Sequence, residues 1–204
     1  WQIDGKTYAV PQEVFTVENY YNVTKMDELG VELPENKQLS QDAYLELVKS
    51  AVAAGMAPLA VGVGDRPYPG AYMAEELLLK QLGIEDYGRL LDGKLSYEDP
   101  RVVEVFEYIG KLAEAGLYPK SFTTMTLGET WPYFESNPGA LMLLMGSFYA
   151  ARPFVNKVPD DFRLGVMSVP AMDEGACNEC KTAAVGASFA VNAASEHKEL
   201  AAAF

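Results

Sequence analysis

The chain has 204 residues, and about half of them are apolar, which suffices for one sizeable core or two smaller lobes. Its formal net charge of -13 would repel nucleic acid and disfavours binding to an anionic membrane surface. No apolar run reaches the length that a bilayer-spanning helix needs. No signal peptide is visible and both ends look cut, so we expect an internal piece of a longer protein.

The first quarter of the chain predicts a strand, a loop and a helix. Residues 6–17 are rich in β-forming residues, although Pro11 interrupts the run, and we expect the chain to turn helical near Glu18. Ser40 is expected to cap the helix that follows the loop. The apolar positions of that helix, which follow helical spacing, are Ala43, Leu47, Val48, Ala51 and Val52.

The middle of the chain predicts a strand and three helices. Residues 57–64 read as a short buried strand, and a helix is expected over 71–82. Asp99 and Pro100 predict the start of the next helix, and Gly116 its end. Its expected buried stripe consists of Val102, Val103, Phe106, Ile109 and Leu112. A capping box of Thr126 with Glu129 predicts a shorter third helix.

Three further strands are expected before a final helix. The six apolar residues 140–145 predict a buried strand, which runs directly into Gly146. Residues 162–170 and 184–192 predict two more strands, and Ser195 is expected to cap the last helix. The alternation of strands and helices throughout the chain predicts an α/β architecture, with helices packed over a sheet.

The two cysteines, Cys177 and Cys180, lie in an acidic loop that contains a glycine. A structural zinc site needs about four ligands, and the chain has only one histidine besides this pair, so a closed Cys/His site cannot be built. A redox Cys-x-x-Cys motif normally opens a helix after a strand, which is not the pattern here. The pair is therefore a small loop-closing disulfide or two free thiols. We favour the disulfide, which would suit an oxidising compartment.

Signatures of catalysis are scarce. The chain has neither a glycine-rich phosphate loop nor a G-x-S-x-G motif, and its only histidine, His197, lies in a charged helix start where we expect it to be solvated. Paired carboxylates could suggest glycoside hydrolysis, but Glu75 and Glu76 are adjacent on a helix and point in different directions. Glu13 and Glu18 flank Phe15, and we expect all four carboxylates to lie at the surface or to accept hydrogen bonds. We expect no catalysis, no cofactor and no metal site.

Aromatic and small polar residues follow the predicted strands. In open α/β sheets, ligands gather at the carboxyl ends of strands. Flat rings can contact the apolar face of a sugar, while carboxylates, arginine and hydroxyls hydrogen-bond its hydroxyl groups. Any one of these rings alone would more often belong to the core, so the combination of four strand-end positions supports a site. These positions hold Phe15 and Thr16; Asp65, Arg66 and Tyr68; Ser147, Phe148 and Tyr149; and Gly186 with Ser188.

Four segments in order resemble the family 1 extracellular solute-binding proteins, the maltose-binding-protein-like components of ABC importers. "DGKTYAVPQEVFTVENYYN" resembles the family's first crossover, and "APLAVGVGDRPYPGAYMAEELL" resembles its strand and loop ending in Trp-Pro. "GALMLLMGSFYA" is similar to the family's Gly-Ser-Trp segment, and "AVGASFAVNAASEHKELAAAF" to its Asn-Ala-Ala-Ser segment. Together the matches cover nearly the whole chain.

The resemblance implies a periplasmic-binding-protein-like (type II) fold, in which two α/β lobes joined by hinge strands enclose the solute. Residues 1–13 would be the crossover from an N-terminal lobe that is mostly absent from this chain. Residues 14–184 would form the C-terminal lobe, and residues 185–204 the return strand and helix of the N-terminal lobe. The first hinge would cross near Glu13 to Thr16 and the second near Ala184 to Ala187.

The resemblance also implies roles for the residues at the strand ends. Phe148 stands where the family usually has a sugar-stacking Trp, which narrows the stacking surface. The "Tyr-Asn-Lys-Asp" pattern is replaced by "YNVT", the Pro-x-Thr-Trp helix start by "PENKQLSQDAY", and "ACNEC" is not a family feature. The ligand-binding residues that we expect are Glu13, Phe15, Thr16, Asp65, Arg66, Tyr68, Ser147, Phe148, Tyr149 and Ser188.

The function that this resemblance implies is binding of a carbohydrate, a mono- or oligosaccharide, between the lobes, followed by delivery to an ABC transporter membrane permease. We expect an extracytoplasmic monomer, either periplasmic or a cell-surface lipoprotein. A non-sugar solute, such as a polyamine or a small anion, is the first alternative. The others are a carbohydrate-active enzyme and a purely structural α/β domain, in which Phe15, Tyr68 and Phe148 would be buried in separate cores.

Overall fold

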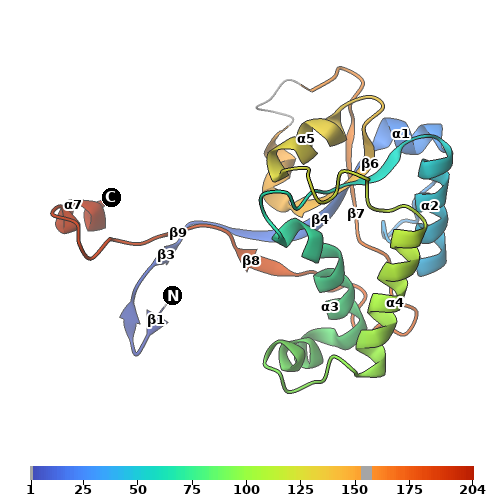
Figure 1. Ribbon diagram of the computed structural model, residues 1–204. Coiled ribbons are helices and arrows are strands. Elements are labelled where there is room, and N and C mark those ends of the chain that lie inside the picture. The colour runs from blue at the N-terminus through green and yellow to red at the C-terminus, as the bar shows by residue number, and fades with distance from the viewer. Residues whose placement is uncertain (1, 153–157) are drawn as a thin grey trace. The chain divides into compact units, whose positions relative to one another are not determined.

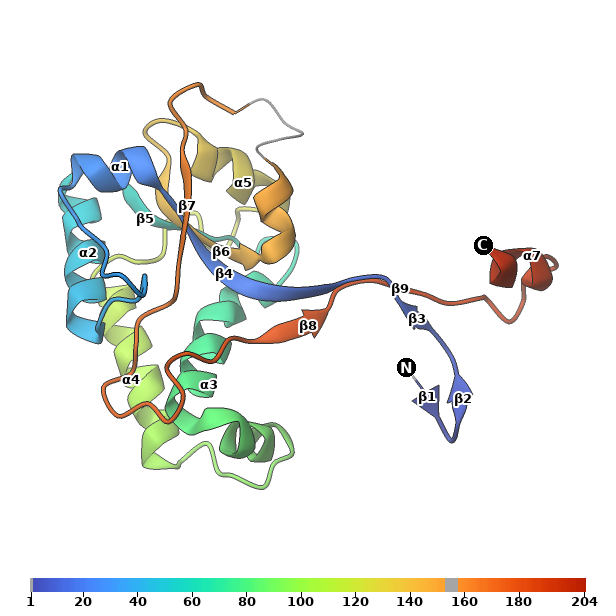
Figure 2. The same cartoon turned by 180° about the vertical axis from the view of Figure 1, so that it is seen from behind.

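The chain forms two compact units in the computed structural model, which describes residues 2–152 and 158–204 (Figures 1 and 2). The larger unit is the contiguous segment Val17–Thr182. The smaller unit combines the two terminal segments, Trp1–Thr16 and Ala183–Phe204. The mixture of strands and helices agrees with the α/β class expected from the sequence. The expected lobe boundaries, residues 14–184, remain a prediction.

The larger unit is built on a mixed sheet with the strand order β5-β6-β4-β7. β6 (Ala140–Gly146) is the apolar run expected to be buried, and all seven of its residues are. It pairs in parallel with β5 (Ala57–Ala60) on one side and antiparallel with β4 (Val14–Asn22) on the other. β7 (Leu164–Met167) adds to the far edge of β4, also antiparallel.

The chain does not turn helical near Glu18, so that prediction was wrong. β4 continues to Asn22, because both of its edges are paired with neighbouring strands over this stretch. Its aromatic residues favour a pleated, buried surface. Helix α1 (Val23–Glu28) begins only after β4, where the Asn22 side chain accepts a hydrogen bond from the Lys25 backbone.

Helix α2 (Gln41–Ala53) begins where the sequence indicated. The Ser40 hydroxyl accepts a hydrogen bond from the Ala43 backbone N–H, which confirms the expected cap. Leu47, Val48 and Ala51 are buried as expected, but Ala43 and Val52 are exposed. Tyr44, the next residue along the helix, is buried instead of Ala43.

Helix α4 (Pro100–Glu114) has the expected ends but a different buried face. The Asp99 carboxylate accepts from the Arg101 backbone N–H, and Gly116 lies beyond the last turn with a φ of 93°. The prediction that Val103 and Phe106 are buried was wrong, since both are exposed. The buried residues are Val102, Val105, Tyr108 and Leu112. The Tyr108 hydroxyl donates to the Gln41 carbonyl, which orients this face towards α2.

Helices α3 and α5 complete the α-helices that can be given bounds in the described part of the larger unit. Helix α3 (Tyr68–Leu91) contains the helix expected over 71–82, and Gly83, with a φ of 73°, interrupts its regular backbone. Helix α5 (Leu127–Glu135) begins at the expected capping box, in which the Glu129 carboxylate accepts from the Thr126 backbone N–H. Nowhere in residues 2–152 and 158–204 is a helix both long and apolar enough to cross a membrane.

The smaller unit consists of short strands and one short helix. The strand expected over 184–192 is two strands, β8 (Ala183–Val185) and β9 (Ser188–Phe189), which pair with residues 14–16 and with β3 (Val10–Pro11). Helix α7 (Lys198–Ala203) starts after His197, so the expected cap at Ser195 was wrong by two residues. The other strands are β1 (Gln2–Ile3) and β2 (Lys6–Thr7), which form a hairpin.

Candidate functional site

The carboxyl ends of β5 and β6 meet at one edge of the sheet. The two strands are parallel neighbours, with Leu59 opposite Met142, so the segments that follow them leave the sheet on the same side. The loop of residues 61–67 follows β5, and the 3-10 helix η1 (Ser147–Ala151) follows β6. The larger unit thus brings together two of the strand-end segments that the sequence singled out.

The loop after β5 is held by backbone contacts that require glycine. The Val63 and Gly64 N–H groups donate to the carbonyls of Phe122 and Met125, both at 2.9 Å. A Cβ atom at Gly62 would lie 2.2 Å from the Met125 carbonyl oxygen. This contact was not among the predictions made from the sequence. The alternating glycines of residues 62–64 were the available signal, since close backbone approach excludes a side chain.

Asp65 and Arg66 extend from this loop towards solvent. One Asp65 carboxylate oxygen accepts a hydrogen bond from the Leu127 N–H at 2.8 Å, which fixes the loop to the first turn of α5. The Arg66 Nε lies 3.8 Å from the other Asp65 oxygen, and both side chains are exposed, so this ion pair contributes little to stability. Asp65 therefore has a structural contact in addition to its proposed role towards a ligand.

Tyr68, at the start of α3, presents a ring to solvent. Its residue surface is 38% exposed, and its ring centroid lies 5.7 Å from that of Tyr72, in a tilted arrangement. Tyr72 is buried, and burial raises the pKa of its phenol to about 12, with the neighbouring Tyr68 adding to the shift. The neutral ring of Tyr72 thus packs against the Tyr68 ring on its buried side.

Ser147 and Phe148 begin η1 at the end of β6. The Tyr20 hydroxyl, from the central strand β4, donates to the Ser147 carbonyl at 3.2 Å and fixes this turn. Phe148 is 39% exposed. Gly146 and Ser147 therefore end the buried strand, and Phe148 is the first aromatic residue to leave the core.

Tyr149 does not belong with this exposed set, and its assignment as a ligand-binding residue is corrected. It is only 1% exposed, and its ring packs against those of Tyr20, Trp131 and Phe134. Its hydroxyl donates to the buried Glu135 carboxylate at 3.0 Å. Burial and this carboxylate raise the pKa of Tyr149 far above its ordinary value. In a 3-10 helix, adjacent side chains point in different directions, so Phe148 and Tyr149 separate between surface and core.

The four other predicted ligand residues belong to the smaller unit. Glu13 and Ser188 are exposed, and Phe15 and Thr16 are half-buried. The Gly186 N–H donates to the Glu13 carbonyl at 3.3 Å, and a Cβ atom at Gly186 would lie 2.4 Å from the Glu13 carboxylate. Each unit thus contributes part of the expected set, which stays a prediction as a whole.

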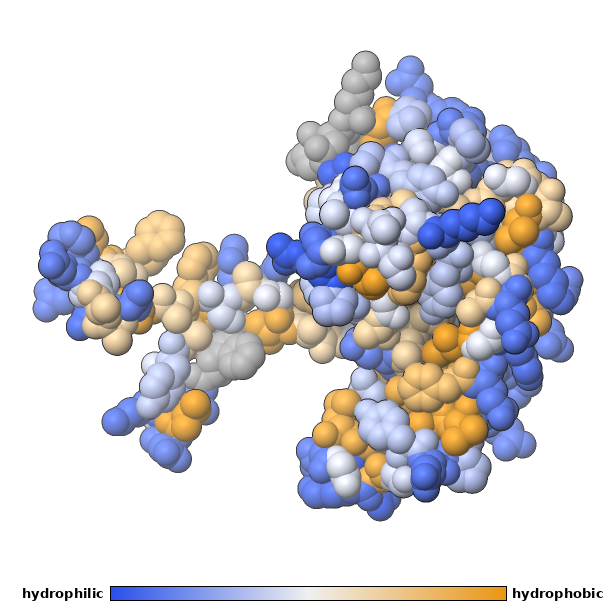
Figure 3. All heavy atoms as spheres, in the orientation of Figure 1, coloured by the Kyte–Doolittle hydropathy of each residue, from blue (hydrophilic) through white to orange (hydrophobic). Residues whose placement is uncertain are grey.

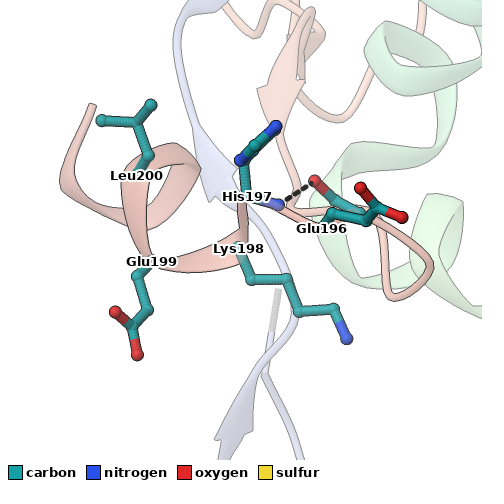
Figure 4. A pocket seen from close by; sticks show the side chains of 6 residues that line it. Glu196, His197, Lys198, Glu199 and Leu200 are labelled. Atoms are coloured by element: carbon teal, nitrogen blue, oxygen red, sulfur yellow. Dashed lines mark hydrogen bonds between the residues drawn. The ribbon is translucent and has the colours of Figure 1, made fainter.

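The hollow near the C-terminus lacks the features of a binding site. It is lined by the consecutive residues 195–200, whose side chains point away from one another in Figure 4. His197 is exposed, in agreement with its expected solvation, and its backbone N–H donates to the Ser195 hydroxyl. Within the described part of the chain, no group of three His, Cys, Asp or Glu residues is placed to hold a metal ion.

Comparison with known proteins places the chain among solute receptors. All of residues 1–204 match the model of a family described as bacterial extracellular solute-binding protein. An arabinooligosaccharide-binding protein from Halalkalibacterium halodurans is 24% identical over 205 residues, which are 97% of this chain and 42% of that protein. The chain thus spans less than half the length of this curated relative.

Solved structures share the fold at low sequence identity. A chain from work on xylan utilization by the thermophilic bacterium Caldanaerobius polysaccharolyticus matches with a TM-score of 0.88 and 20% identity, over 99% of this chain and 50% of that one. A chitin oligosaccharide binding protein matches with a TM-score of 0.80 and 23% identity, over 98% and 49% of the two chains. These likenesses establish a solute-binding-protein fold that extends over about half of each relative.

Proposed function

The chain belongs to the family of bacterial extracellular solute-binding proteins, and from this premise we propose that it forms part of a carbohydrate receptor. The receptor would be the substrate-binding component of an ABC importer and would act without catalysis. In this proposal residues 14–184 are its C-terminal lobe, residues 1–13 cross from an N-terminal lobe, and residues 185–204 return to it. The solute would bind between the lobes.

The observation that carries this proposal is the pair of half-exposed rings at one edge of the sheet. Tyr68 and Phe148 follow adjacent parallel strands and are 38% and 39% exposed. Asp65 and Arg66 add a carboxylate and a guanidinium on the loop that leads into Tyr68. Rings that contact the C–H face of a sugar, with charged groups that hydrogen-bond its hydroxyls, make a suitable carbohydrate surface. Full burial of Phe15, Tyr68 and Phe148 in separate cores would have favoured the purely structural alternative.

The names of the relatives favour a sugar over other solutes. The curated relative is an arabinooligosaccharide-binding protein, and one structural relative is a chitin oligosaccharide binding protein. A polyamine or a small anion remains the alternative solute, and it would need several charges of one sign around the site. The Asp65 and Arg66 side chains carry opposite charges, which suits a neutral polar solute better than either ion.

Transport would follow from closure of the hinge. A solute that contacts both lobes binds the closed state more tightly and so shifts the population towards it. The membrane permease of the importer would then recognise the closed receptor. This role places the protein outside the cytoplasm, as a monomer in the periplasm or as a lipoprotein at the cell surface.

A thermal-shift screen of the full two-lobe protein against mono- and oligosaccharides, polyamines and small anions would test the proposal. A solute that binds only the folded state raises the melting temperature, by an amount that grows with its concentration. We expect at least one sugar to do so, and incubation with the same sugar to leave it unhydrolysed. A shift caused only by a polyamine or an anion would replace the sugar, and turnover would establish the enzyme alternative.

A further inference from the structure

The segment that precedes β8 is closed by a disulfide and lies against helix α3. We call residues 176–182 the anchor segment. Cys177 and Cys180 are joined by a disulfide, as favoured from the sequence. The Ala176 and Cys177 N–H groups donate to the carbonyls of Gln81 and Lys80 on α3, at 3.3 and 2.9 Å. The anchor segment ends at Thr182, and β8 begins with the next residue.

A buried lysine holds the middle of the anchor segment. Lys80 is 0% exposed, and its ammonium group donates to the carbonyls of Asn178 and Cys180, at 2.6 and 2.8 Å. The Gln38 side chain also donates to the Asn178 carbonyl, at 2.9 Å. Burial lowers the pKa of Lys80, because it disfavours the charged ammonium group. The hydrogen bonds and the nearby carboxylates offset this cost.

A buried glutamate, one turn earlier on α3, holds the end of the anchor segment. Glu76 is 2% exposed, and one of its carboxylate oxygens accepts from the Thr182 N–H at 2.8 Å and from the Thr182 hydroxyl. Burial raises the pKa of Glu76, while the Thr182 hydrogen bonds and the charge of Lys80 oppose the shift. Two charged residues, four positions apart on one helix face, thus bind consecutive parts of the same segment.

The anchor segment is tied in turn to the strand by which the chain enters the larger unit. The Thr182 carbonyl accepts from the Val17 N–H at 3.2 Å, and the Lys181 ammonium group is paired with the Glu18 carboxylate. Val17 and Thr182 are the first and last residues of the larger unit. Glu76 therefore holds Thr182 directly, and it holds Val17 through the Thr182 backbone. These two residues are the points where the chain leaves and enters the larger unit.

We propose that Glu76 and Lys80 are positioning residues, which fix the point where the two connecting segments leave the larger unit. Bending during closure would then be confined to residues before Val17 and after Thr182. Tyr68, Glu76 and Lys80 all lie in the part of α3 that precedes the interruption at Gly83. The proposed ligand-facing ring and the anchor segment would therefore move as one body. This inference rests on the proposed function for its link to closure, but the anchoring itself requires no solute.

Hydrogen exchange measured by mass spectrometry on the full two-lobe protein, without solute, would test the anchoring. We expect exchange in peptides that cover residues 181–185 to become at least tenfold faster in Lys80→Met and in Glu76→Leu. Glu76→Gln keeps an oxygen that can accept from the Thr182 N–H, so its exchange should stay close to that of the wild type. If Lys80→Met fails to fold, the same measurement on Glu76→Leu tests the proposal.

Lys25→Met is the matched control. Lys25 is also a buried lysine, and its ammonium group donates to three backbone carbonyls, those of Ser136, Pro138 and Ala140. Its loss should lower the melting temperature but leave exchange at residues 181–185 unchanged. Wild-type exchange there in Lys80→Met and Glu76→Leu, or equal acceleration in Lys25→Met, would overturn the proposal.

Solute titration by calorimetry adds the link to closure. The comparison applies when both variants have melting temperatures lowered by similar amounts. Lys80→Met should then change the affinity for the solute at least threefold, and Lys25→Met should not. If no solute binds the wild type, the proposed receptor function fails, while the exchange result still decides the anchoring. If solute binds the wild type and Lys80→Met with equal affinity, the link between the anchor and closure is refuted.

Discussion

Replacing Phe148 by alanine measures how much a ring at the sheet edge contributes to solute binding. A phenylalanine presents roughly 200 Å² of surface, and Phe148 leaves 39% exposed, so about 80 Å² can contact a solute. At about 25 cal/mol per Å², loss of this contact costs about 2 kcal/mol. We therefore expect Phe148→Ala to weaken affinity by about thirtyfold in a calorimetric titration of the full two-lobe protein.

Phe106→Ala provides the control for this experiment. Phe106 is 46% exposed on α4, so its removal takes away a ring of comparable exposure without altering the sheet edge. Both variants should lose some stability and keep the fold of the larger unit, whose core contains neither residue. An affinity of Phe148→Ala equal to that of the wild type would remove this ring from the site and refute the reasoning from exposure.

Three predictions concern stability, each measured by urea unfolding. Leu143→Ala, in the fully buried β6, should lower the free energy of unfolding by about 2–5 kcal/mol, and the half-exposed Val103→Ala by much less. Ser40→Ala should cost about 1 kcal/mol, since it removes the cap of α2, and no loss would refute the cap. Burial lowers the pKa of Lys25 from 10.5 to about 8, so the unfolded chain binds more protons between these values. The contribution of Lys25 to stability should therefore rise from about pH 8 to 10.5, and Lys25→Met should lack this rise.

The starts of α2, α4 and α5 and the longest apolar run could be predicted from the sequence, because their signals are local. The Ser40 cap, the Asp99 cap and the Thr126–Glu129 box are all present. A side chain two or three residues from the backbone group that it binds leaves a short-range pattern. The run of residues 140–145 needed no partner to be identified either, since a strand buried on both faces is apolar throughout.

The failures arose where distant residues decide the outcome. β4 continues past Glu18 because β6 and β7 pair with it there, and these strands lie more than 100 residues later. The buried face of α4 differs from the predicted one. It contains Tyr108, whose hydroxyl donates to the Gln41 carbonyl, while Phe106 is exposed. Periodicity alone cannot choose between overlapping apolar stripes on one helix.

The candidate site was predictable as a region but not residue by residue. Strand ends indicated the edge that carries Asp65, Tyr68 and Phe148, and the parallel pairing of β5 and β6 brings their loops to that edge. The sequence could not separate Phe148 from Tyr149, since two adjacent aromatic residues differ only in which one finds a core. The partners that bury Tyr149 come from β4 and α5.

The hydrogen bond between Val17 and Thr182 also has a consequence for protein engineering. The larger unit is a contiguous stretch whose two ends meet. Such a stretch can be excised, or inserted into another protein at a single point, with little disturbance of that protein's backbone. Exchange of this module between relatives would need only two junctions, which lie side by side. A short linker from residue 182 to residue 17 would similarly permit circular permutants with new termini on the surface.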